Sequence, residues 1–182
     1  MNANITKTIE QAVSTRIAYL REHPEKIRTR EKAAIARVKT ELQCEVSVDG
    51  NVALTTDMPA VLGGGGSAPT PGWFMRAALA SCDATTIAMR AACLGVSLET
   101  IEVTVESESD ARGILGVDDA KAGPRQFLTH IRIKAANGDR GRVQEIVDWA
   151  LAHSPVADAM QRSVRNKVDL QVDEGHRERW RP

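Results

Sequence analysis

The stretch Gly63–Cys82 reads GGGGSAPTPGWFMRAALASC and decides how the rest of the chain is interpreted. A glycine-rich, proline-punctuated loop leads into a run of small and apolar residues that predicts a helix from about Gly72 to Leu94, ended by Gly95. Cys82 lies about three turns inside this helix. A thiol in that position is either inert packing or a nucleophile, and the function depends on which.

Length and composition limit the possible functions. The chain has 182 residues, 42% of them hydrophobic, which is enough for one domain with a core. Lys plus Arg and Asp plus Glu both number 24, so charge gives no argument for nucleic acid or an anionic membrane as a partner. No apolar run approaches the roughly 20 residues of a membrane span, and the polar segment Met1–Gln11 does not resemble a signal peptide. These features predict a soluble, cytoplasmic protein.

Neither a metal site nor a cofactor site is indicated. The three cysteines and four histidines are scattered, without a CxxC motif or any recognisable ligand spacing. The four consecutive glycines lack the lysine and hydroxyl residue of a phosphate-binding GxxxxGK[ST] loop. We therefore expect no bound metal and no cofactor.

An amphipathic helix is predicted at the N-terminus over Asn4–Arg21, where apolar residues recur at spacings of four and three until Pro24 ends it. We interpret residues 1–24 as a helical extension and residues 25–182 as the main domain. The apolar stripe of this helix has to be buried, either on its own domain or in a dimer contact.

The rest of the chain predicts an α+β fold with a largely antiparallel sheet and helices on one face. Period-two alternation predicts strands within Ala33–Thr55, Val96–Glu108, Phe127–Ala135 and Val168–Val172. The dipeptide Asp49-Gly50 is a hairpin signal. Further helices are expected over Arg140–Ala152 and from Ser154, as the N-cap, to Met160.

Four segments together resemble the OsmC/Ohr family. They are Pro71, the run AALASC over Ala77–Cys82, the loop GILG over Gly113–Gly116, and HSPV over His153–Val156. The resemblance extends from about Arg37 to Val172. It implies an OsmC-like fold assembled as an intertwined homodimer, in which two long central helices are buried at the interface.

The resemblance also implies a role in the oxidative stress response. Active members reduce organic hydroperoxides with two cysteines, and an external dithiol restores the pair. Cys82 matches the peroxide-attacking cysteine. The resolving cysteine is replaced by Ser154, the activating glutamate after Pro71 is replaced by Gly72, and the activating arginine of the first strands has only Arg37 as a candidate.

The residues themselves give Cys82 little support within its own helix. A reactive cysteine has to be a thiolate, which needs a nearby cation or hydrogen-bond donors. Arg76 projects to another face, and Arg90 is about 12 Å away along the axis. Cys93 returns to the same face, but about 16 Å along the helix, which is too far for a disulfide within one helix. Cys44, on a predicted strand, is the more plausible intrachain partner, although a buried structural role also fits it.

Three functions remain open at this point. The first is a one-cysteine hydroperoxide reductase that uses Cys82 and an external thiol. The second is a non-catalytic protein that binds a hydrophobic small molecule against an apolar wall of Trp73, Phe74 and Met75, residues that could equally be ordinary core. The third is an interaction module that docks through the N-terminal helix.

Overall fold

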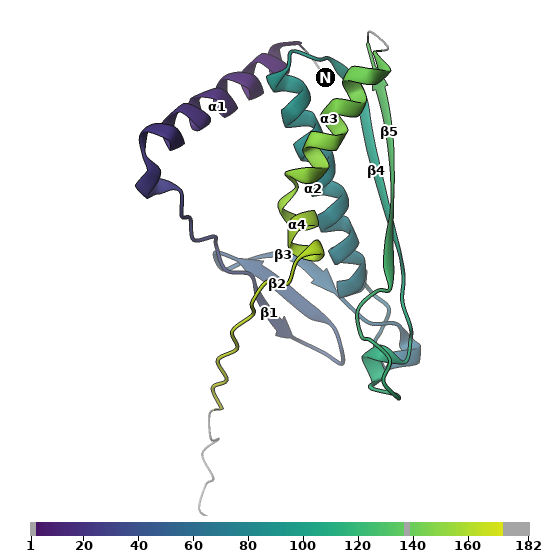
Figure 1. Ribbon diagram of the computed structural model, residues 1–182. Helices are drawn as coiled ribbons and strands as arrows, with labels where there is room; N and C mark the ends of the chain where they lie inside the picture. The colour runs from purple at the N-terminus through teal and green to yellow at the C-terminus, as the bar shows by residue number, and fades with distance from the viewer. Residues whose placement is uncertain (1–2, 137–138, 173–182) are drawn as a thin grey trace, which may run out of the picture.

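The computed structural model describes residues 3–136 and 139–172, and it shows an α+β chain built around one long helix (Figure 1). The helices are α1 (Ala3–Glu22), α2 (Pro71–Cys93), α3 (Arg140–Ala152) and α4 (Pro155–Gln161). The strands are β1 (Ile35–Val38), β2 (Cys44–Val48), β3 (Asn51–Thr56), β4 (Leu98–Glu108) and β5 (Gln126–Ala135). Short 3-10 turns lie at Pro24–Lys26, Ala60–Leu62 and Gly113–Leu115.

The strands form two antiparallel sheets, in the orders β1-β2-β3 and β4-β5. The hairpin between β2 and β3 turns at Asp49 and Gly50, whose φ angles of 51° and 81° are both in the left-handed region. A tight primed turn requires such angles at both central residues, as the Asp-Gly signal predicts. The antiparallel α+β class expected from the sequence is confirmed.

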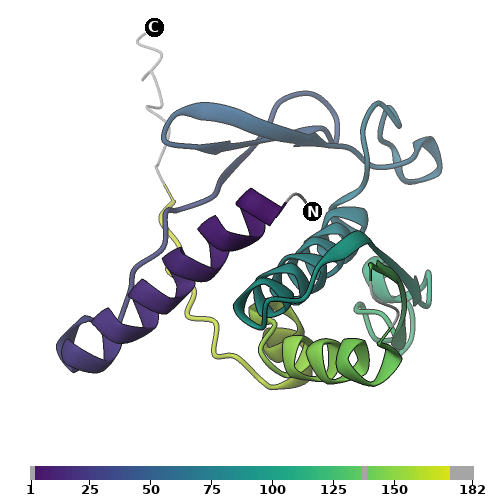
Figure 2. The ribbon, with the colours of Figure 1, turned by 90° about the horizontal axis from the view of Figure 1, so that it is seen from above.

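The core lies between α2, α3 and the inner face of the β4–β5 sheet. Its fully buried residues are Ile87 and Ala91 from α2, Leu98 from β4, and Ile146 and Ala150 from α3. Partly buried residues from alternate positions of β4 and β5 pack against them, so these strands bury one face only. Figure 2, seen from above, shows α2 and α3 side by side next to this sheet.

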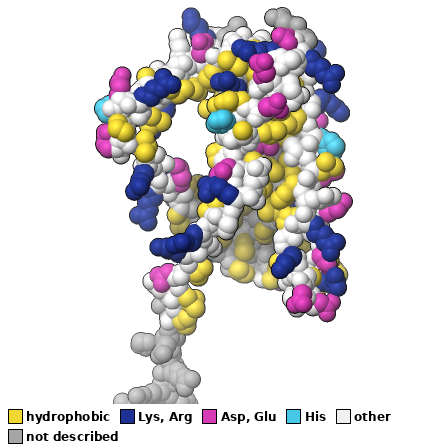
Figure 3. Space-filling view, in the orientation of Figure 1, with side chains coloured by type: hydrophobic (Ala, Val, Ile, Leu, Met, Phe, Trp, Pro, Cys, Tyr) yellow, Lys and Arg dark blue, Asp and Glu magenta, His cyan; other side chains and the backbone are white. Residues whose placement is uncertain are grey.

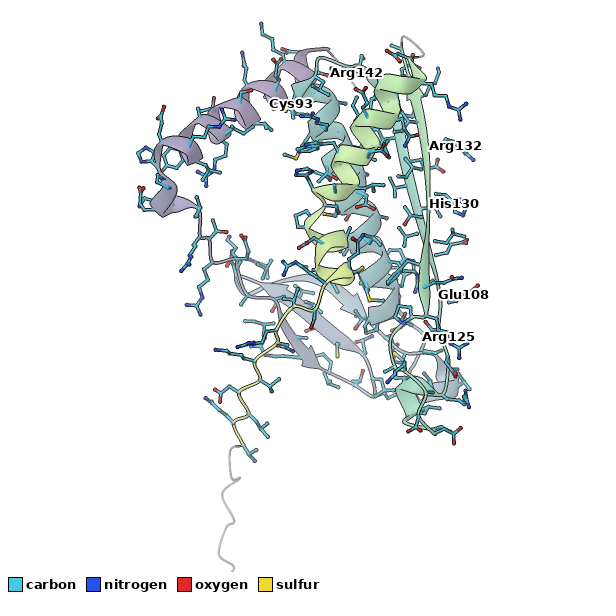
Figure 4. All side chains as sticks on the ribbon, in the orientation of Figure 1. Cys93, Glu108, Arg125, His130, Arg132 and Arg142 are labelled. Atoms are coloured by element: carbon cyan, nitrogen blue, oxygen red, sulfur yellow. The ribbon has the colours of Figure 1, made fainter. Side chains whose placement is uncertain are left out.

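The outer face of the β4–β5 sheet is polar. His130 is exposed there, and cross-strand ion pairs join Glu102 to Arg132 and Glu99 to Lys134. In Figure 4, Glu108, His130 and Arg132 point away from the helices. This face is therefore in contact with water and takes no part in the core.

Helix α1 extends one residue beyond each end of the predicted range Asn4–Arg21, and part of its apolar stripe remains exposed. It meets one end of α2 and then slopes away from the body (Figure 1). Ile5 remains 53% exposed and Ile17 44% exposed. Figure 3 shows an open hollow between α1 and the other helices, with apolar side chains on both sides of it.

The predicted last strand is wrong for this structure. Residues 163–172 contain no strand, and Val168, Leu170 and Val172 are at least 75% exposed. The alternation of a strand is present, but an extended segment becomes a strand only when its backbone pairs with a neighbour. No described strand pairs with this segment.

Candidate functional site

The Cys82 thiol lies where α2 meets the start of α4. Cys82 is partly buried, and its Sγ accepts a hydrogen bond from the Ser154 hydroxyl over 3.3 Å. The serine is completely buried. The position that the resemblance assigns to the resolving cysteine is therefore in direct contact with the thiol.

Ser154 is held in place by the start of α4. Its hydroxyl oxygen accepts a hydrogen bond from the Ala157 backbone N–H over 3.4 Å, and Pro155 occupies the first helical position. The Ser-Pro pair thus forms the N-cap that the sequence predicts. A serine hydroxyl can accept and donate at once, so capping leaves its single hydrogen available for Cys82.

Asp83, the next residue along α2, is a buried carboxyl beside the same serine. It is 2% exposed, and its Oδ1 has no hydrogen-bond partner among the described residues. Burial raises the pKa of the Asp83 carboxyl above its ordinary value, and the Ser154 hydroxyl lowers it in part. Asp83 is not among the candidates predicted above, because nothing in the sequence signals its burial.

Cys82 also lines an apolar groove of about 500 Å³ between α1 and the helices α2 and α3. The groove is lined by Val13, Ile17, Ser81, Cys82, Thr85, Thr86, Met89, Arg90, Cys93, Trp149, His153 and Pro155. Figure 4 shows the labelled Cys93 near the end of α2. The two cysteines of α2 therefore share one groove, as their eleven-residue spacing predicts, and both are free thiols.

A stack of three side chains forms one part of the groove wall. The Arg90 guanidinium lies over the Trp149 ring at 4.5 Å, and the His153 ring stacks on the same tryptophan at 3.9 Å. His153 Nδ1 is 2.7 Å from the Trp149 carbonyl oxygen. Arg90 is thus the cation of this groove, a placement that the sequence analysis did not predict.

The predicted apolar wall lies elsewhere on α2. Trp73, Phe74 and Met75 are in its first turns and are not among the residues that line the groove. Trp73 packs edge-on against Phe74, with ring centroids 5.0 Å apart, and is 47% exposed. About 13 Å of helical rise separates Trp73 from Cys82. The structure therefore does not bring this cluster together with the thiol.

The other candidates from the sequence are not among the residues that line the groove of Cys82. Arg37 is exposed on β1, opposite Glu45 in the register. Cys44 is on β2, opposite Val38 and Thr56. Arg76 donates to the Ser107 hydroxyl of β4 over 3.2 Å, so it faces the sheet, away from the groove.

The glycine loop before α2 is organised by Asp57, which the sequence analysis missed. This carboxylate is 2% exposed and accepts hydrogen bonds from the backbone N–H groups of Met58, Gly65 and Ser67 and from the Ser67 hydroxyl. These donors, those of Ser67 first, lower the pKa of Asp57. The preference of aspartate for bonding backbone N–H groups in turns is the signal that could have found it.

No three metal-ligating side chains gather among the described residues. Within the same residues, no helix has the length and hydropathy needed to cross a bilayer.

The fold and site define an α+β protein with a free thiol on a long central helix, next to a buried serine. A protein-family model described as OsmC-like protein matches residues 64–169. The chain therefore belongs to the OsmC/Ohr family.

Solved structures of this family share the fold at low sequence identity. An OsmC-like protein from Mycoplasma pneumoniae is 16% identical with a TM-score of 0.61, over 74% of this chain and 89% of that one. An organic hydroperoxide resistance protein from Elizabethkingia anophelis, with thiocyanate bound, is 14% identical with a TM-score of 0.56, over 75% and 92%. An OsmC-like protein of unknown function from Vibrio cholerae is 13% identical with a TM-score of 0.60, over 72% and 94%. No curated protein matches the sequence.

Proposed function

We propose that this protein is a thiol-dependent reductase of organic hydroperoxides in which Cys82 is the peroxide-attacking thiol. The observation that carries the proposal is the placement of Cys82 Sγ, on an apolar groove and within hydrogen-bond distance of Ser154. The names of relatives such as the organic hydroperoxide resistance protein from Elizabethkingia anophelis support this class of substrate.

The reaction divides into two steps. The Cys82 thiolate attacks the terminal oxygen of the hydroperoxide, the O–O bond breaks, and the alkoxide takes up a proton and leaves as the alcohol. Cys82 is then a sulfenic acid. Because Ser154 has no thiol, an external dithiol has to reduce it: one thiol forms a mixed disulfide and releases water, and the second displaces Cys82.

Consumption of an alkyl hydroperoxide in the presence of dithiothreitol tests this proposal. Cys82→Ala is expected to abolish the protein-dependent rate, and Cys93→Ala, which removes the other thiol of the groove, is the matched control. Equal rates in the wild type and in Cys82→Ala would refute the proposal.

Two arginines are candidates for the cation that favours the thiolate. Arg37 lies in the first strands, where the resemblance places the activating arginine. Arg90 lines the groove of Cys82. The same assay with Arg37→Gln and Arg90→Gln separates them, since only the activating cation should lower the rate with peroxide.

We propose that the protein acts as a homodimer. The open apolar groove and the exposed isoleucines of α1 leave a surface that a second copy of the chain could cover. Sedimentation equilibrium should give twice the mass of one chain, and Ile17→Glu should weaken the association. A single-chain mass at micromolar concentration would contradict this assembly.

A second function is favoured by the chemistry of the groove itself. Val13, Ile17, Met89 and Trp149 form walls suited to an apolar ligand, and such a protein would need no reaction at Cys82. Quenching of tryptophan fluorescence by a long-chain fatty acid, lost in Trp149→Phe, would support binding. The cluster of Trp73, Phe74 and Met75 remains a second proposed wall, and Trp73→Phe tests it in the same titration.

A further inference from the structure

Arg90 is the only side chain with a permanent charge among the described residues that line the apolar groove between α1 and the helices α2 and α3. Its guanidinium lies over the Trp149 ring, 4.5 Å from the ring centroid. Stacking covers one face of the guanidinium, whereas its N–H donors point outward within the plane of the group. The tryptophan therefore holds the cation in place and leaves its donors able to bind an acceptor.

This guanidinium has no acidic partner in the part of the chain that the structure describes. None of the ion pairs there includes Arg90, and its buried Nε has no hydrogen-bond acceptor. On α3, Glu145 pairs with Arg142. The carboxylate of Asp148 accepts a hydrogen bond from Gln144. Because an arginine is always charged and a buried N–H group favours an acceptor, this wall of the groove favours an anion.

Three other polar side chains of the groove are bonded to backbone carbonyl groups. The hydroxyls of Ser81 and Thr86 donate to carbonyl oxygens of the preceding turn of α2, over 3.1 and 3.0 Å. His153 Nδ1 is 2.7 Å from the Trp149 carbonyl oxygen. These side chains are therefore engaged with the protein itself, and Arg90 is the group best placed to bind the polar end of a ligand.

The rest of the groove is suited to hydrocarbon. Val13 and Ile17 line it from α1 and Met89 lines it from α2, and Figure 3 shows apolar side chains on both sides of the hollow. The volume of about 500 Å³ is within the range of roughly 300–1,000 Å³ that is typical of small-molecule sites. A small inorganic anion would lose its hydration without filling this space, whereas an amphipathic anion matches both the cation and the apolar walls.

We propose that this groove binds an apolar monocarboxylate, with the carboxylate held by the Arg90 guanidinium and the hydrocarbon chain between α1 and α2. The two oxygens of a carboxylate can accept parallel N–H bonds from one guanidinium. The inference rests on the second proposed function, the binding of an apolar ligand, and it adds the charged end of that ligand and the residue that recognises it. It does not depend on the reaction proposed for Cys82.

Two ligands with the same chain length and different charge, decanoate and decanol, test the proposal in the wild type. Isothermal titration calorimetry below the micelle concentration measures both affinities. Decanoate should bind at least about tenfold more tightly, which is the effect expected of a hydrogen bond to a charged group. In NMR spectra, the Arg90 Nε–H resonance should shift when decanoate is added and much less when decanol is added.

Substitutions of Arg90 test the same point from the side of the protein. Arg90→Gln should lower the affinity for decanoate at least about tenfold and leave the affinity for decanol unchanged. Arg90→Lys keeps the charge without the planar fork, so it should retain part of the affinity for decanoate. Arg142→Gln is the matched control, because it removes a cation of α3 that does not line the groove. If Arg90→Gln does not fold, as judged by circular dichroism, the two ligands and the Arg90 resonance in the wild type decide the question.

Equal affinities for decanoate and decanol in the wild type would overturn the proposal and leave the binding of apolar ligands in place. Binding of neither compound would overturn both. If Arg90→Gln weakens self-association but not the binding of decanoate, the arginine pairs with a second copy of the chain and the proposal is wrong. The same conclusion follows if Arg90→Gln slows peroxide consumption and binds decanoate as the wild type does.

Discussion

The Ser154 hydroxyl and Cys82 Sγ lie 3.3 Å apart although 72 residues separate them in the chain. Folding thus places the residue at the proposed resolving position directly against the proposed reacting thiol. One side chain of this pair carries a thiol and the other a hydroxyl, and the first prediction follows from that difference.

Ser154→Cys should give the protein a resolving thiol. An S–S bond is about 2.05 Å long, so the two side-chain atoms have to approach by little more than 1 Å. One equivalent of hydroperoxide should then remove two free thiols from the variant, whereas the wild type should lose only one. Thiol titration and mass spectrometry measure this, and Ser154→Cys combined with Cys82→Ala should form no such disulfide. If Cys82 is oxidised while the thiol introduced by Ser154→Cys stays free, the two positions cannot be joined.

Asp57→Asn should destabilise the glycine loop at neutral pH. The donors around Asp57 lower its pKa below that of the unfolded chain, about 3.9, so its contribution to stability is present above that value. It is lost as the pH falls through the pKa of the folded state. The difference in Tm between the wild type and Asp57→Asn should therefore be largest above about pH 5 and shrink in acid. Asp119→Asn, at an exposed loop position, should show no comparable difference.

Asp83→Asn should show the opposite pH dependence of stability. Burial raises the pKa of Asp83 in the folded state, so the wild type loses stability as the pH rises from about 3.9 through that raised pKa. The variant carries no such charge. Its Tm relative to the wild type should rise between pH 4 and pH 8 in thermal scans. If the difference in Tm between the variant and the wild type does not change with pH, burial does not raise the pKa of Asp83.

Two glycine-to-alanine changes, one on either side of Thr70, should have different effects on the free energy of unfolding. A Cβ at Gly64 would collide with the backbone carbonyl of Met58, so Gly64→Ala should destabilise the fold by about 1–3 kcal/mol. At Gly72, in the first turn of α2, a Cβ would meet nothing closer than Thr70 Oγ1 at 3.8 Å. Gly72→Ala should therefore be neutral or stabilise by up to about 1 kcal/mol, because alanine is the better helix former. Urea unfolding measures both changes.

Most helices and strands could be predicted because each has a local signal. The period of apolar residues indicated α1, β4, β5 and α3, Asp49-Gly50 indicated the hairpin, and Ser154-Pro155 indicated the start of α4. The predicted strand over Val168–Val172 failed because a strand needs a neighbour, which local alternation does not provide.

The site was predicted only in part, for a related reason. Cys82 and Ser154 were identified through motifs, but their contact depends on how α4 packs against α2. The burial of Asp83 and the placement of Arg90 over Trp149 also depend on packing between helices. Such contacts join residues far apart in sequence, and no periodicity encodes them.

The hydrogen bonds of Asp57 also limit where residues can be inserted into or deleted from the chain. This carboxylate accepts hydrogen bonds from the backbone N–H groups of both Met58 and Ser67. A loop of a different length between these two residues could not keep both bonds without changing its shape. Helix α2 begins at Pro71, only a few residues after that loop, so an insertion or deletion there would alter how α2 starts. We therefore expect natural or engineered variation in length to be tolerated poorly between residues 58 and 67.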